Sequence, residues 1–111
     1  MAIFSTHLLN SIDGTHASDV EIIIHKVNKK NKVVFLKDKT DSSGRMLKEF
    51  ELSKEDCESD YEMIINSGKY FRNTSEIINS ISVKFKMKDS EKKYHIPLII
   101  SPNGYSIWWS K

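Results

Sequence analysis

The segment 81–87, Ile-Ser-Val-Lys-Phe-Lys-Met, alternates apolar and polar residues without a break. A period of two is the period of a β-strand, whose successive side chains point to opposite faces. The pattern predicts a strand that buries Ile81, Val83, Phe85 and Met87 against a core and leaves the residues between them to water. A chain with such a strand must supply other strands to pair with it.

Further short apolar runs occur, separated by turn residues, at 19–27, 32–37, 60–66, 94–101 and 104–109. The opening segment FSTHLLN adds another strand, and only 69–78 suggests a short helix. Many short strands at this spacing are typical of an all-β sandwich. With 111 residues, of which 39% are apolar, the chain suits one domain spanning 1–111 with its own core.

Composition narrows the setting in which the protein works. The single cysteine, Cys57, cannot form an internal disulfide, and no charged start followed by an apolar run indicates secretion. No apolar stretch reaches the length of a membrane span. The 17 basic and 15 acidic residues are scattered, which favours a solvated surface over a nucleic-acid site. We therefore expect a cytoplasmic protein with no membrane and no nucleic-acid partner.

Histidines are the main candidates for chemistry. The sequence has no glycine-rich phosphate loop, no paired cysteines and no His-x-x-x-His spacing, so nucleotide and zinc sites have little support. His16 lies in a turn-like stretch and His25 ends a strand, and we expect both at the surface. His7 and His95 each interrupt an apolar strand. Either histidine alone would be interpreted as a hydrogen-bonded core residue, but two on pairing strands could position and deprotonate a water near neutral pH.

Arg45 is the third candidate. Only two of the 17 basic residues are arginines, Arg45 and Arg72, so lysine serves wherever a simple charge suffices. An arginine in the turn TDSSGR therefore suggests a need for the planar guanidinium, which binds flat anionic groups through paired donors. The alternative is that Arg45 is one surface charge among many.

Four segments, FSTHLLN, TDSSGR, SGKYF and YHIPLIISPNGYS, resemble in order and spacing the signature segments of the transthyretin-like family. They are most similar to its enzymes, the 5-hydroxyisourate hydrolases. The resemblance covers the whole chain and implies an all-β, two-sheet transthyretin-like sandwich of seven to eight strands with one short helix. It also implies a homotetramer whose active sites lie in a channel between dimers.

The resemblance implies a catalytic set as well, made of His7, Arg45 and His95 in this chain. The implied substrate is a planar oxidised purine of urate breakdown, whose cyclic amide bond is hydrolysed without a metal or an organic cofactor. The two histidines would activate water and protonate the leaving nitrogen, in an order that the sequence leaves open. Arg45 would stabilise the negative charge at a carbonyl oxygen.

The C-terminus departs from the pattern of these enzymes, which typically end in Tyr-Arg-Gly-Ser. Here the same places hold Trp108, Trp109, Ser110 and Lys111. If the tail is a strand, Ile107, Trp109 and Lys111 share one face, and the resemblance implies that this face contacts the substrate while Ser110 points away. Two alternatives therefore stay open: a hydrolase of another cyclic amide or imide, and a binding protein with a blocked channel.

Overall fold

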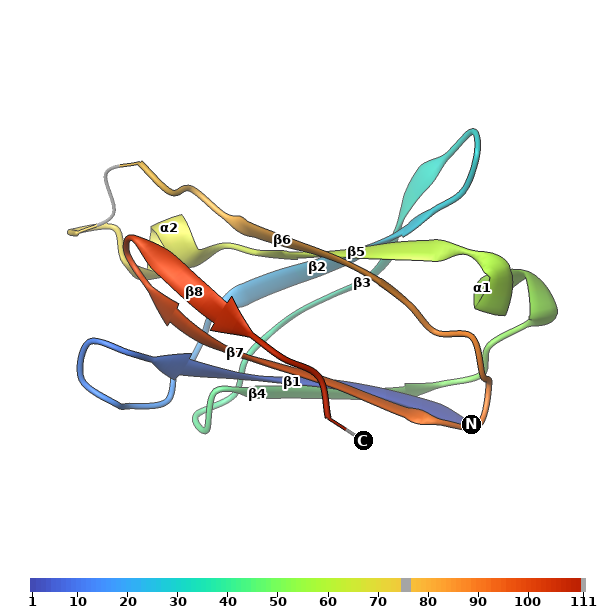
Figure 1. Cartoon of the computed structure of the whole chain (residues 1–111), viewed down its shortest axis with the longest axis horizontal. Coiled ribbons are helices and arrows are strands. Elements are labelled where there is room, and N and C mark those ends of the chain that lie inside the picture. The colour runs from blue at the N-terminus through green and yellow to red at the C-terminus, as the bar shows by residue number, and fades with distance from the viewer. Residues whose placement is uncertain (75–76, 111) are drawn as a thin grey trace.

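The structure is a computed structural model and describes residues 1–74 and 77–110. Within these residues the chain forms two four-stranded sheets that lie face to face (Figure 1). In order across the first sheet, the strands are β4 (Arg45–Phe50), β1 (Ala2–Asn10), β7 (Lys93–Ser101) and β8 (Gly104–Ile107). Those of the second sheet are β3 (Lys32–Lys39), β2 (Glu21–Val27), β5 (Asp60–Ile65) and β6 (Ile81–Lys86). The all-β two-sheet prediction is confirmed.

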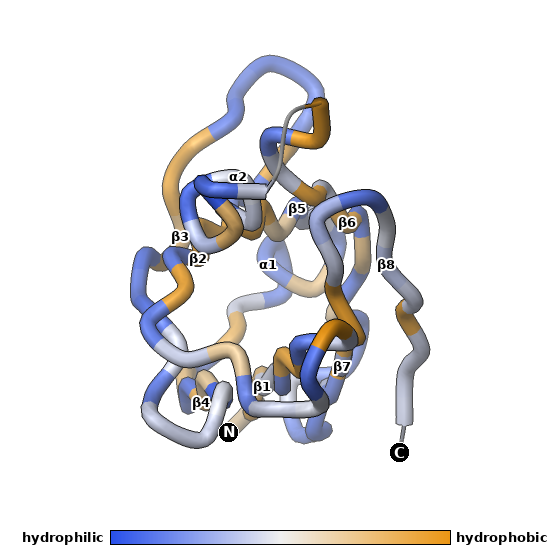
Figure 2. Tube along the Cα trace, turned by 90° about the vertical axis from the view of Figure 1, so that its left-hand side faces the viewer, coloured by the Kyte–Doolittle hydropathy of each residue, from blue (hydrophilic) through white to orange (hydrophobic). Residues whose placement is uncertain are grey.

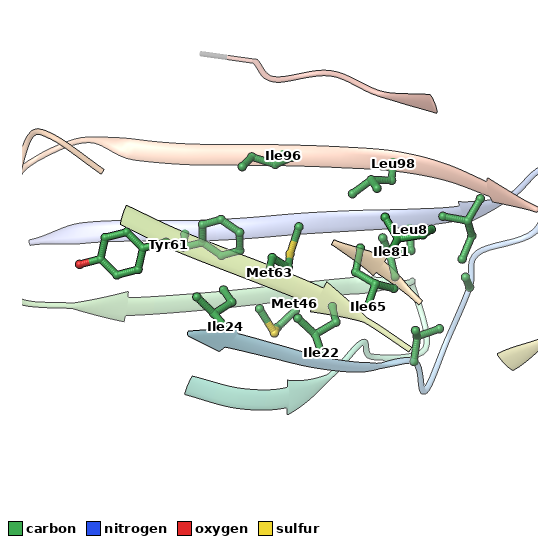
Figure 3. Close-up of a cluster of buried hydrophobic side chains, with 14 of the residues drawn as sticks. Leu8, Ile22, Ile24, Met46, Tyr61, Met63, Ile65, Ile81, Ile96 and Leu98 are labelled. Atoms are coloured by element: carbon green, nitrogen blue, oxygen red, sulfur yellow. The ribbon is translucent and has the colours of Figure 1, made fainter. Parts of the chain in front are cut away.

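The core lies between the two sheets and follows the alternation of the strands (Figure 3). On β1, for example, Phe4 and Leu8 are fully buried, whereas Ser5 and His7 on the other face are only half-buried. Tyr61 of β5 is the largest fully buried side chain, and its hydroxyl donates a 2.7 Å hydrogen bond to the Asp56 carbonyl. Burying a large apolar side chain contributes about 1.5–3 kcal/mol, so this layer stabilises the sandwich.

The outer face of the first sheet points away from this core. Its central pair, β1 and β7, runs parallel, whereas β4 and β8 pair antiparallel at the two edges. Residues that are directly paired across neighbouring strands point to the same face of a sheet. The register therefore fixes which side chains meet on this face.

Strand β4 was not predicted from the sequence pattern. Its inward-facing positions are Met46, Lys48 and Phe50, so a lysine interrupts the apolar alternation. The Lys48 ammonium reaches the edge of the sandwich and forms an ion pair with Asp38 of β3. An edge position thus lets a charged residue stand where a central strand needs an apolar one.

The helices also differ from expectation. Two short ones occur in the described part of the chain, α1 (Lys54–Glu58) and α2 (Ser67–Tyr70), and α2 begins and ends earlier than the predicted 69–78. Asn66 caps α2 by accepting from the Lys69 amide, which sets its start. Residues 75 and 76 of the predicted helix lie outside the described residues. With five and four residues, neither helix is long enough to cross a membrane.

Candidate functional site

Two rows of side chains cross the outer face of the first sheet. The first row joins Arg45 of β4 to His7 of β1 and then to Pro97 of β7, each directly paired with the next. The second row joins Leu47, Ser5 and His95 in the same way. The structure therefore places Arg45 beside His7, and it places His95 diagonally from His7 on the neighbouring strand. All three residues of the predicted catalytic set lie on one face.

The tight turn before β4 positions Arg45. Gly44 has a φ of 72°, and a Cβ there would lie 2.5 Å from the Leu8 carbonyl oxygen, so only glycine fits. The Asp41 carboxylate closes the turn by accepting from the amides of Ser43 and Arg45 at 2.8 and 3.0 Å. These bonds hold the pKa of Asp41 below its usual range, because they stabilise the carboxylate.

The Arg45 side chain is exposed at the edge of this face. Its guanidinium forms no ion pair with any carboxylate of residues 1–74 and 77–110. Within this described part of the chain, no carboxylate competes with an anionic or strongly polar ligand for the guanidinium donors.

His7 is half-buried, and its environment disfavours the charged imidazolium. Burial has the largest effect in lowering its pKa, and the charges of Arg45, His16 and His95 act in the same direction. A hydrogen bond to the Ser43 backbone opposes the shift. His7 is therefore a neutral base at a pH where an ordinary histidine begins to be protonated.

His95 is held by a hydroxyl from the neighbouring strand. The Ser5 Oγ and the His95 Nδ1 are 2.7 Å apart, and this hydrogen bond fixes the orientation of the ring. The other ring nitrogen, Nε2, does not take part in it. Ser5 was not singled out in the sequence, although it stands two residues before His7 and therefore shares its face. The spacing of two along a strand was the signal that could have found it.

The orientation predicted for the tail is wrong. The Trp108 amide donates to the Pro97 carbonyl at 3.3 Å, and Ser110 pairs with His95 through a 3.1 Å bond. Trp108 therefore extends the first row and Ser110 extends the second, on the face of the histidines. This register continues from the pairing of Leu98 with Ile107. That pairing sets the face of the sheet to which each later side chain points.

The pairing puts Ile107 on the inward side of β8, and continuation of that register puts Trp109 there too. They line an open apolar groove of about 840 Å³ between the edges of β6 and β7, together with Val83 and Phe85. Figure 2 shows the tail along this side of the sandwich. Substrate binding by Ile107 and Trp109 stays a prediction, and the groove that they line is also lined by His95, Trp108 and Ser110. Lys111 lies outside the described residues.

His16 was predicted at the surface, and it is exposed, but it also joins the site. Its Nδ1 lies 3.0 Å from the His7 Nε2, and the two rings stack with centroids 5.2 Å apart. No pattern in the sequence indicates this contact, because it depends on the chain folding back to pair His16 with Leu9. His25 lies on β2 of the other sheet and is half-buried rather than at the surface.

In chemical terms, this face combines groups that can exchange protons with a group that can bind an anion. Three imidazoles and one guanidinium meet on it, and no three His, Cys, Asp or Glu side chains among the described residues gather closely enough to hold a metal ion. Such a set can exchange protons near neutral pH and stabilise negative charge on an oxygen atom.

Residues 4–109 match the HIUase/Transthyretin family. The chain belongs to this family. A curated relative, the 5-hydroxyisourate hydrolase of Salmonella typhimurium, is 29% identical over 108 residues, which cover 96% of this chain and 79% of the relative. The predicted family resemblance is confirmed.

Solved structures of the HIUase/Transthyretin family show the same fold under two kinds of name. The 5-hydroxyisourate hydrolase of Klebsiella pneumoniae superposes with a TM-score of 0.78 at 20% identity, over 98% of this chain and 99% of that one. Transthyretin from Sparus aurata superposes with a TM-score of 0.80 at 17% identity, over 96% and 95%. The family fold thus occurs in proteins of both names, so the activity must be argued from the site.

Proposed function

We propose that the protein hydrolyses the cyclic amide bond of an oxidised purine of the 5-hydroxyisourate type. The observation that carries the proposal is the direct pairing of Arg45 with His7, with His95 diagonal to His7 on the same exposed face. Relatives at 23–29% identity that are named 5-hydroxyisourate hydrolases support the choice of substrate class.

The chemistry requires an activated water and a stabilised oxyanion. The histidines take a proton from the water as its oxygen forms a bond to the ring carbonyl carbon, and they return a proton to the ring nitrogen as the carbon–nitrogen bond breaks. The Arg45 guanidinium donates to the carbonyl oxygen, where negative charge develops. Ser5 keeps the His95 ring in one orientation during these steps.

The proposal is tested by adding the purified protein to freshly generated 5-hydroxyisourate and following the decay of its absorbance. We expect decay well above the spontaneous rate, and about a hundredfold loss of turnover in His7→Asn and in His95→Asn. Arg72→Lys serves as a control, because Arg72 lies beyond α2 and away from this face. Decay at the spontaneous rate with the wild-type protein would contradict the proposal.

A second candidate is a hydrolase of a different cyclic amide or imide. Trp108 favours it, because its indole extends the row of Arg45 and His7 and offers a stacking surface. A panel of cyclic amides and imides assayed beside 5-hydroxyisourate separates the two. A higher kcat/KM for another member of the panel would favour this second candidate.

We also propose a homotetramer, as the family resemblance implies. The exposed Ile107 and Trp109 beside the apolar groove support self-association, because large apolar patches are rarely left exposed on monomers. Light scattering at micromolar concentration should give a mass about four times the 12.9 kDa of one chain. A mass near that of one chain would refute it.

A further inference from the structure

The stacked pair of His7 and His16 is built by the backbone. After β1 the chain turns back on itself, and the Asn10 amide donates to the Thr15 carbonyl at 2.8 Å. The Ala17 amide then donates to the Leu8 carbonyl at 2.9 Å, on the other side of His16. Bonds on both sides of the residue fix where its ring can lie, so the 3.0 Å contact between the His16 Nδ1 and the His7 Nε2 follows from the fold.

The hydrogen bonds around His7 determine which ring carries the shared proton. A bond between two ring nitrogens needs one N–H and one lone pair. The His7 ring also has a hydrogen bond to the Ser43 backbone that raises its pKa, so the backbone group is an acceptor. Because the His7 Nε2 faces His16, we assign this bond to the His7 Nδ1. The Ser43 amide is already donated to Asp41, which agrees with the carbonyl being the partner.

Neutral His7 therefore carries its proton on Nδ1, for the Ser43 carbonyl, and has a lone pair on Nε2. His16 must then donate from its own Nδ1. The His16 Nε2 then carries a lone pair. This lone pair is the one that the stacked rings expose to solvent, since the His16 side chain is exposed.

We propose that His16 is a proton acceptor of the site and that it works with His7 as a two-imidazole relay. The proposal rests on the hydrolase function proposed above. As the water oxygen bonds to the ring carbonyl carbon, the water proton passes to the His16 Nε2. The resulting imidazolium donates a charge-assisted bond to the His7 Nε2, which spreads the positive charge over both rings. The proton returns to the ring nitrogen when the carbon–nitrogen bond breaks, so that one water is added and His16 is neutral again.

The charged and titratable groups around the pair suit this role. Arg45 from β4 and His95 from β7 both disfavour a positive charge on His7, and Asp41 of the neighbouring turn is the acidic group that interacts with it. His7 therefore stays neutral and keeps its lone pair for His16. The exposed outer ring is the one that can take up a proton from water.

The test compares two replacements of His16. Asparagine places an amide donor near the position of the His16 Nδ1 and so keeps the bond to His7, but it cannot accept a proton. Alanine removes both abilities. A proton acceptor predicts that His16→Asn and His16→Ala both lose about a hundredfold in kcat at neutral pH, whereas His25→Asn on the other sheet keeps full activity. Wild-type activity in His16→Asn would overturn the proposal, because His16 would then only position His7.

A second measurement separates a failure of the relay from a failure of the hydrolase function. Histidine side-chain ¹⁵N NMR reports which ring nitrogen carries the proton, with or without a substrate. We expect neutral His7 and neutral His16 each to carry the proton on Nδ1, and the His7 pKa to rise in His16→Ala, since the charge of His16 lowers it. A proton on the Nε2 of neutral His16 overturns the relay even if the protein hydrolyses 5-hydroxyisourate. An inactive wild type would refute the hydrolase function, and the tautomers would still decide the relay.

Discussion

Replacing Gly44 by alanine should damage the site more than replacing Gly14, although both glycines have the same kind of backbone. Their φ values are 72° and 76°, in the left-handed region that costs other residues about 1–2 kcal/mol. A Cβ on Gly14 meets nothing within 4 Å, so backbone strain is the only cost of Gly14→Ala in the folded state. The unfolded chain has less conformational entropy with alanine at this position than with glycine. This difference offsets part of the strain and leaves a net cost of about 1 kcal/mol.

Gly44→Ala adds a steric cost to the same strain. Its Cβ would lie 2.5 Å from the Leu8 carbonyl oxygen, and that oxygen is held in place by the Ala17 amide at 2.9 Å. Overpacking against a fixed neighbour costs about 1–3 kcal/mol more, which brings the total to about 2–4 kcal/mol. For a chain of this length, 1 kcal/mol shifts the melting temperature by about 4 °C. We therefore expect a decrease of about 4 °C for Gly14→Ala and about 8–16 °C for Gly44→Ala.

The assay is calorimetry or thermal unfolding followed by circular dichroism, together with turnover at a temperature where both variants are folded. Gly44→Ala should also lose activity while folded, because relief of the clash moves Arg45 away from His7. Equal melting temperatures for the two variants would refute the reasoning, since only one of them has a neighbour to clash with.

Three further predictions concern the same face of the sheet. Arg45→Lys should lower kcat/KM about a hundredfold in the hydroxyisourate assay, because the charge survives and the paired donors do not, whereas Arg72→Lys should not change it. The His7 pKa is lowered from 6.5 in the folded protein, so the unfolded chain binds the proton first as the pH falls. The free energy of unfolding of the wild type relative to His7→Asn should therefore decrease below about pH 6.5, as measured by urea denaturation at several pH values, and a difference that grows toward acid would contradict the shift. Trp108→Ala should change KM severalfold and Trp109→Ala should not, because only Trp108 lies in the row of the histidines; the opposite result in steady-state kinetics would mean that the tail has another register.

The sequence predicted the sandwich because most strands lie where burial alternates strictly. Strand β6 matches the alternation from Ile81 almost to its predicted end, with Met87 buried just beyond it. The same argument failed for β4, where Lys48 occupies an inward position and finds Asp38 across the edge. An ion pair between two sheets depends on which strands lie at the edge, and a pattern within one segment carries no such information.

The arrangement of the candidate site could be predicted only in part, for a similar reason. His7, Arg45 and His95 were recognised from short motifs, and their meeting on one face follows from the pairing of their strands. His16 was placed at the surface, since its contact with His7 depends on how a loop folds back. The face on which each tail side chain lies was predicted from the alternation along the tail alone. That face is set by the residue paired with it on the neighbouring strand, and Ser110 is paired with His95.

This register gives the unusual C-terminus a different meaning and a test of its own. Replacing residues 108–111 by Tyr-Arg-Gly-Ser would put the arginine at 109, on the side of the apolar groove lined by Val83 and Phe85, and the glycine beside His95. The graft would then remove a hydroxyl from the row of His95, take an indole out of the apolar groove and add a positive charge near Lys84, Lys86 and Lys93 of the groove lining. We therefore expect the graft to lower hydroxyisourate turnover and the melting temperature, and Ser110→Gly alone to reproduce the loss of turnover without the loss of stability. Higher turnover in the graft would refute this expectation and show that its arginine reaches His95 across the groove that both positions line.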